Sequence, residues 1–180
     1  MSNRDRIYWI TRTAILIALL IVMQAVTAPM SMFVTGSIVN LLLIISVMTC
    51  GLASGLSVAV VSPVLAKLFG IGPLWSLIPF ITLGNISLIL VWHFIGNHKA
   101  KNAILPYSIA LVSAAVAKFA VLYIGIVLIA VPMILGLPEP QAGVISNMFS
   151  IPQLITASIG GAVATVVLPI LKSALKKGQE

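Results

Sequence analysis

The chain alternates between long apolar runs and short clusters rich in glycine, proline and charged residues. A transmembrane helix needs about 20 mainly apolar residues, and Gly/Pro clusters and charges mark the breaks between such helices. The segments PMSMFVTGS and GLPEPQAGVISN are predicted to be loops. The second and third helices are short for full spans and are separated by CGLASG. The pattern predicts six transmembrane helices, over residues 9–28, 38–51, 55–69, 77–96, 105–135 and 148–172.

The basic residues give an independent indication of orientation. With six spans, both termini and the connector between the fourth and fifth helices lie on one side of the membrane. Lysine and arginine concentrate in cytoplasmic segments of membrane proteins, so we expect both termini to be cytoplasmic. Eight of the ten basic residues fall on that side: Arg4, Arg6, Arg12, Lys99, Lys101, Lys172, Lys176 and Lys177.

The composition favours the same class of protein. Of the 180 residues, 61% are hydrophobic and only 7% are charged, and the mean hydropathy is +1.21. A soluble domain needs more polar surface than this. We therefore expect an all-α integral membrane protein with one transmembrane domain over residues 1–180. The formal net charge of +7 does not indicate nucleic-acid binding, because the cations lie at the chain ends and in one connector.

Polar side chains inside the predicted helices gather in the half that faces away from the termini. Amides within a membrane usually face the bundle interior or a water-filled cavity. The shared depth favours a polar pocket open to the outside, and the alternative is that these amides only tie helices together. The set comprises Gln24, Asn40, Asn85, Asn147 and Gln153, with Lys67 and Tyr123 at a similar depth.

Lys118 is the only charged residue in the apolar run SAAVAKFAVLYIG. A lysine at mid-span cannot easily extend its ammonium group to the membrane surface. It therefore needs a cluster of carbonyls, a water-filled cavity or an anionic group of a ligand. Contact with a ligand or cavity and purely structural pairing both remain open from the sequence.

Motifs for catalysis and for nucleotide hydrolysis do not occur. The three acids, Asp5, Glu139 and Glu180, lie outside the predicted spans, so carboxylate pairs for acid–base chemistry are missing. Neither GxxxxGK[ST] nor HExxH is present, and the two histidines lack metal-ligand spacing. We expect no enzyme, no metal site and no cofactor. If the protein moves a solute uphill, the energy comes through another subunit.

The sequence resembles the substrate-binding S components of energy-coupling factor (ECF) vitamin transporters. The first resemblance is Arg-Thr-Ala followed by the AxxxA pattern AILIA, which places Ala14 and Ala18 on one face of the first helix. Small residues at this spacing allow another helix to approach closely. The second is the stretch over 35–90, with a TG-x-x-VN opening and a later P-F-x-x-x-GN. Length, six-helix layout and orientation extend the resemblance over nearly the whole chain.

This resemblance implies a multi-pass protein of a prokaryotic plasma membrane with a vitamin site near the outer face. It implies docking, through Ala14 and Ala18, on a transmembrane coupling protein that carries two ATPase subunits. In this family, outer loops and helix ends form the pocket. We add Asn40, one of the amides named above, to the candidates. By position, the candidate substrate-binding residues are Phe33, Asn40, Trp75, Asn85, Lys118, Tyr123, Asn147 and Gln153.

Aromatic and amide side chains in such a pocket suit a small heteroaromatic ring with hydroxyl groups, such as a hydroxymethylpyrimidine or a pyridoxine-like molecule. Lys118 is equally compatible with a carboxylate such as that of pantothenate, and cobalamin also stays open. Two rival functions remain. One is a stand-alone facilitator or channel for a small solute, and the other is a structural membrane protein that transports nothing.

Overall fold

The computed structural model describes residues 3–98 and 104–177, and every regular element in this part of the chain is helical. The first half comprises α1 (Asn3–Thr27), α2 (Met32–Cys50) and α3 (Leu52–Leu68), followed by the short 3-10 helix η1 (Trp75–Leu77). Two helices then continue in π-helical form: α4 (Ile78–Val91) into η2 (Trp92–Gly96), and α5 (Ile104–Leu122) into η3 (Tyr123–Leu135). The last two helices are α6 (Glu139–Met148) and α7 (Ile151–Lys177).

Five helical stretches are long and apolar enough to cross a membrane, which is consistent with a multi-pass membrane protein. The shorter α3 has 17 residues and rises about 26 Å at 1.5 Å per residue, slightly less than the hydrocarbon core of a bilayer. The prediction of six apolar helices thus corresponds to five long helices and one shorter one. The long stretches are Arg6–Thr27, Met32–Cys50, Trp75–Gly96, Ile104–Leu135 and Glu139–Leu175.

Two segments predicted to be loops are wholly or partly helical. The helix α2 begins at Met32, six residues earlier than expected, because the hydroxyl of Ser31 accepts a hydrogen bond from the backbone N–H of Phe33 and caps the helix. The predicted loop before the last helix contains α6, which begins directly after Pro138. Pro140 lies in its first turn, where a missing backbone N–H costs no hydrogen bond.

The break between α2 and α3 is a single residue, Gly51. Its φ of 87° lies in a region that glycine adopts readily and other residues avoid. The chain therefore reverses there with almost no connecting loop, and α2 and α3 pack side by side.

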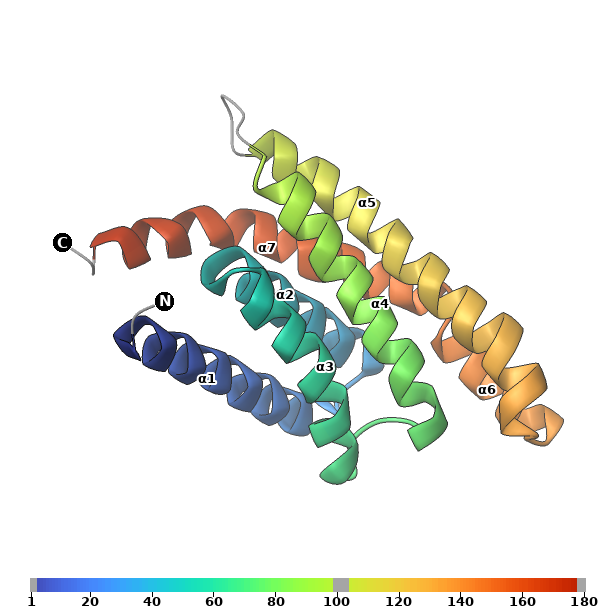
Figure 1. Ribbon diagram of the computed structural model, residues 1–180. Helices are drawn as coiled ribbons and strands as arrows, with labels where there is room; N and C mark the ends of the chain where they lie inside the picture. The colour runs from blue at the N-terminus through green and yellow to red at the C-terminus, as the bar shows by residue number, and fades with distance from the viewer. Residues whose placement is uncertain (1–2, 99–103, 178–180) are drawn as a thin grey trace.

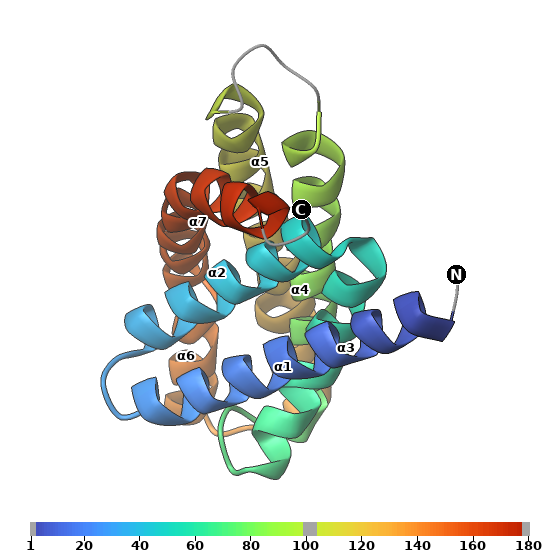
Figure 2. The same cartoon turned by 90° about the vertical axis from the view of Figure 1, so that its left-hand side faces the viewer.

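The helix α2 is the central element of the bundle and contacts α1, α3, α4 and α7, while α5 packs between α4 and α7. Figure 2, turned so that the left side of Figure 1 faces the viewer, shows α1 and α2 in front of α4. The start of α1 and the end of α7 lie at one end of the bundle (Figure 1), here called the terminal end. The opposite end contains the connections at 28–31, 69–74 and 136–138 and is called the cavity end.

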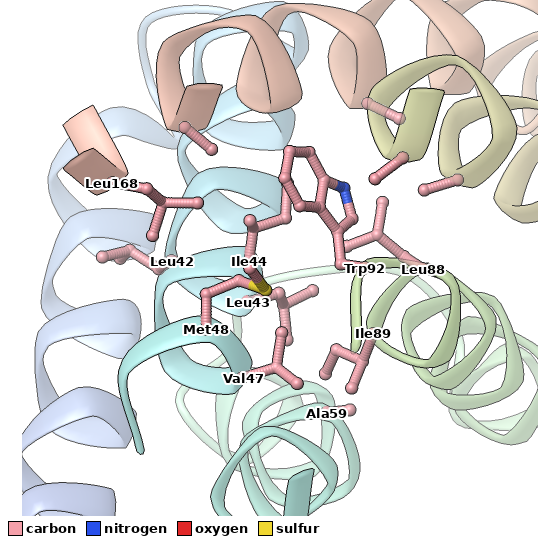
Figure 3. Close-up of a cluster of buried hydrophobic side chains, with 14 of the residues drawn as sticks. Leu42, Leu43, Ile44, Val47, Met48, Ala59, Leu88, Ile89, Trp92 and Leu168 are labelled. Carbon is pink, nitrogen blue, oxygen red and sulfur yellow. The ribbon is translucent and has the colours of Figure 1, made fainter. Parts of the chain in front are cut away.

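Two apolar clusters hold the helices together. In the larger one, Leu43, Ile44 and Val47 of α2 meet Ile89 of α4 and Trp92 of η2 (Figure 3), and all five side chains are at most 1% exposed. A smaller cluster joins η1, the α5–η3 helix and the junction of α6 with α7 at the cavity end, through Leu77, Leu122, Ile126, Ala130 and Phe149. Burial of apolar side chains against neighbouring helices thus fixes the positions of the polar residues between them.

Candidate functional site

A cavity of about 280 Å³, lined by both polar and apolar residues, lies among the helices at the cavity end. Residues of α1, α2, α3, α4, α5, α6 and α7 line it, together with Ile71 and Gly72 of the connection after α3. Its volume is at the lower limit of typical small-molecule sites. Its polar lining residues are Gln24, Thr35, Asn40, Ser62, Asn85, Lys118 and Gln153.

The ammonium group of Lys118 occupies the wall of this cavity and is held by two amides. Its Nζ donates to Oδ1 of Asn40 on α2 at 2.6 Å and to Oδ1 of Asn85 on α4 at 2.8 Å. All three side chains are nearly inaccessible, with Lys118 only 4% exposed. An ammonium group has three N–H donors and no acceptor, so both amides must turn their oxygens toward it. One N–H of Lys118 remains beyond these two bonds.

A second pair of bonds connects Asn40 to α7. The amide nitrogen of Asn40 donates to Oγ1 of Thr156 at 3.4 Å, and the Thr156 hydroxyl donates to the backbone carbonyl of Gln153 at 3.2 Å. The Gln153 side chain in turn donates to the carbonyl of Met148 at 3.0 Å, across the junction of α6 and α7. The position of Asn40, and through it that of Lys118, thus depends on packing of α2 against α7.

Gln24 of α1 also lines the cavity, and its side chain contains an unused acceptor. Its Oε1 is buried and has no hydrogen-bond partner within the described residues. A buried amide oxygen left without a donor costs about 1–3 kcal/mol. A ligand or water with a suitably placed N–H or O–H relieves this cost.

The charge of Lys118 has no acidic counterpart in the cavity. Among the described residues that line it, none is an aspartate or glutamate. Glu139 is the one acid whose side chain is described, and it lies at the start of α6 outside the lining. The cavity therefore combines a buried cation with amide and hydroxyl side chains in its lining, which is chemistry suited to recognising a small molecule with polar groups.

Of the eight predicted substrate-binding residues, four line this cavity: Asn40, Asn85, Lys118 and Gln153. They come from four different helices and are brought together at the cavity end. Each residue lies in the lining because of the direction in which its side chain leaves the helix, and not only because of its position along the helix.

The other four predicted residues lie elsewhere. Phe33 lines a separate apolar groove between α2 and α7, and Trp75 is 53% exposed at the start of η1. Tyr123 stacks on Phe119 with ring centroids 5.5 Å apart. Asn147 is exposed on α6, because this segment forms a helix of its own that directs residue 147 away from the cavity lining.

Sequence reasoning missed Thr156, Thr35 and Ser62. Hydroxyl residues are common in membrane helices, so each one alone carries little signal. Thr156 lies three residues after Gln153 and hence near it on the same helix face, and this spacing was the only available indication. Gln24 belonged to the predicted set of amides but not to the predicted substrate-binding residues.

The predicted docking residues Ala14 and Ala18 are both exposed on α1. Exposure leaves this face available to another helix and does not identify one. Within the described part of the chain, no group of three or more His, Cys, Asp or Glu is arranged to hold a metal ion.

Compared with protein-family models, curated proteins and solved structures, the chain matches none.

Proposed function

We propose that the chain is the substrate-binding subunit of an ATP-driven, ECF-type importer for a small water-soluble vitamin or vitamin precursor. The proposal places it as a multi-pass protein in a prokaryotic plasma membrane. The observation that carries the proposal is the cavity at the cavity end, in which Lys118 is held by Asn40 and Asn85.

Three features support a binding role over a purely structural one. Amides that only tie helices together satisfy each other, whereas Gln24 keeps a buried oxygen without a partner in the described residues. A cation is costly to bury, and intramembrane charges usually serve a function. The cavity is large enough for a small solute, and its polar lining comes from several helices.

We propose partner subunits because this sequence has no ATP-binding loop of its own. It contains no phosphate-binding loop for ATP, so the proposed energy source is a pair of ATPase subunits joined through a transmembrane coupling protein. The proposed contact is the small-residue face of α1, where Ala14 and Ala18 are exposed. Side chains of this size allow another helix to pack closely.

Two measurements test the proposal. The protein is purified from its native membrane in mild detergent, co-purifying proteins are identified, and the denatured sample is analysed by mass spectrometry for released small molecules. We expect ATPase subunits to co-purify and one small polar molecule to be released in a near-stoichiometric amount.

The rival functions predict different results. Solute flux through vesicles containing only this chain, without ATPases, identifies a stand-alone facilitator or channel. Absence of any released molecule, together with unchanged assembly after Lys118→Ala, identifies a structural membrane protein. Either result overturns the proposed function.

A further inference from the structure

We propose, building on the proposed function, that the ligand of the cavity is a small organic monoanion whose carboxylate completes the hydrogen bonding of Lys118. The site then selects a carboxylate over the uncharged molecule of the same shape. This narrows the ligand from vitamins in general to those that carry one acidic group.

The charge of Lys118 is not balanced by an acidic side chain in the described lining of the cavity. Lys118 is 4% exposed, and its two partners, Asn40 and Asn85, are neutral amides. Amide dipoles satisfy hydrogen bonds but supply no net negative charge, and a buried cation without a counter-charge is costly. No acidic residue is present in the described lining of the cavity. An anionic ligand supplies the counter-charge that this lining lacks.

Lys118 has one more N–H donor than its two amide partners use. Lys118 uses two of the three N–H groups of an ammonium ion on Asn40 and Asn85. Because Oδ1 of Asn85 accepts from Lys118, the amide nitrogen of Asn85 lies on the other branch of the amide, where it carries two N–H donors. A carboxylate has two oxygens and only accepts. One oxygen can accept from Lys118 and the other from Asn85.

Gln24 and the volume of the cavity constrain the part of the ligand that lies beyond the carboxylate. Gln24 of α1 lines the cavity, and its Oε1 is buried with no hydrogen-bond partner among the described residues. A turn of this amide toward the cavity offers an acceptor to the ligand, which then carries a hydroxyl or N–H group away from the carboxylate. The cavity of about 280 Å³ limits the ligand to a small molecule. The chemical class is a hydroxy acid, an amide acid or a heteroaromatic acid with a hydroxyl group.

The experiment compares carboxylates with uncharged molecules of nearly the same shape. The full chain, purified in detergent and freed of bound molecules, is titrated with pantothenate and pantothenol, pyridoxate and pyridoxine, and nicotinate and nicotinamide. Binding is measured by calorimetry and by the shift of the thermal unfolding midpoint. We expect a carboxylate to bind about 10- to 100-fold more tightly than its uncharged counterpart, the range for a hydrogen bond to a charged group.

The variant Asn85→Asp supplies the missing charge from the protein itself. A carboxylate at position 85 pairs with Lys118, so we expect carboxylate affinity to fall about 10- to 100-fold and the preference over the uncharged counterpart to disappear. Asn97→Asp makes the same chemical change at an exposed position at the terminal end and is expected to leave both affinities unchanged.

The outcomes separate this inference from the proposed function. It is overturned when an uncharged molecule binds as well as its carboxylate, when Asn85→Asp keeps the preference, or when no carboxylate binds and the molecule released from the native protein has no acidic group. Release of an acid from the native protein supports it. A carboxylate that binds the unmodified protein and binds more weakly to the Asn85→Asp variant supports it as well. Tight binding of a carboxylate without co-purifying ATPases supports this inference and contradicts the importer.

Discussion

Gly160 of α7 lies so close to Asn40 of α2 that a Cβ at position 160 would be 2.8 Å from the Cβ of Asn40 and 2.6 Å from the carbonyl oxygen of Ser37. Backbone atoms cannot move aside as the end of a flexible side chain can. The absence of a side chain at this one position therefore lets α7 approach α2 at the residue that holds Lys118. Packing between two helices and the geometry of the candidate site are coupled at this contact.

Gly160→Ala is expected to separate α2 from α7 locally and to destabilise the protein by about 1–3 kcal/mol, as overpacking of a close contact does. Gly143→Ala is the matched control, because a Cβ there meets no atom within 4 Å. In helix α6, alanine is favoured over glycine by about 0.5–1 kcal/mol. The midpoint of thermal unfolding in detergent should fall for Gly160→Ala and stay or rise for Gly143→Ala. Equal midpoints for the two variants would contradict the close contact between α2 and α7.

Lys118→Ala is expected to weaken binding of the native ligand by about 1–3 kcal/mol, because a buried polar partner then loses its hydrogen bond. The ligand is the molecule released from the purified protein, and its affinity is measured by calorimetry. Lys172→Ala is the control for loss of a lysine. Lys172 donates to the Tyr107 hydroxyl at 3.2 Å near the terminal end, so its removal should leave the affinity unchanged. Equal affinities for Lys118→Ala and the unmodified protein would remove Lys118 from the site.

Ala14→Leu combined with Ala18→Leu is expected to abolish uptake and to leave ligand binding by the isolated protein intact. Leucine at both exposed positions prevents close approach of another helix without touching the cavity. The control is Val112→Leu with Val116→Leu, which adds bulk four residues apart on an exposed face of α5. Uptake in cells and binding in detergent are measured for both. Parallel loss of uptake and binding would argue against a separate docking face on α1.

Thr13→Val is expected to lower the free energy of unfolding by about 1–3 kcal/mol, because it leaves the buried hydroxyl of Ser54 without its partner. The hydroxyls of Thr13 on α1 and Ser54 on α3 are 2.6 Å apart and buried. Thr13 donates its own hydrogen to the carbonyl of Trp9, so Ser54 is the donor between the helices.

The control for this variant is Thr165→Val, since the Thr165 hydroxyl donates to the carbonyl of Gly161 in its own helix. A double-mutant cycle with Ser54→Ala measures the coupling between α1 and α3. A coupling energy of zero would show that the two hydroxyls do not stabilise the helix pair.

The sequence by itself determined most of the helical segments and the end of the bundle at which most of the polar residues gather. Apolar runs, Gly51 and the prolines are local signals, so six apolar helices and the segment containing Lys118 followed from them. Alternation of helix direction then brought most of the predicted amides to the same end of the bundle. The helix α6 escaped prediction because Pro138, Pro140 and Gly143 are typical of a loop. A proline in the first turn, where Pro140 lies, is nevertheless compatible with a helix.

The tertiary structure decided which polar side chains meet. Asn40 and Asn85 are separated from Lys118 by 78 and 33 residues, and no local pattern connects them. The sequence of a membrane helix that is apolar around its whole circumference gives little indication of how the helix is turned about its axis. Successive side chains nevertheless point about 100° apart around that axis, so this turn decides whether a side chain faces a cavity or the outside. Close packing at Gly160 and burial of the two apolar clusters set these rotations, so Asn40 and Gln153 face the cavity while Tyr123 and Asn147 do not.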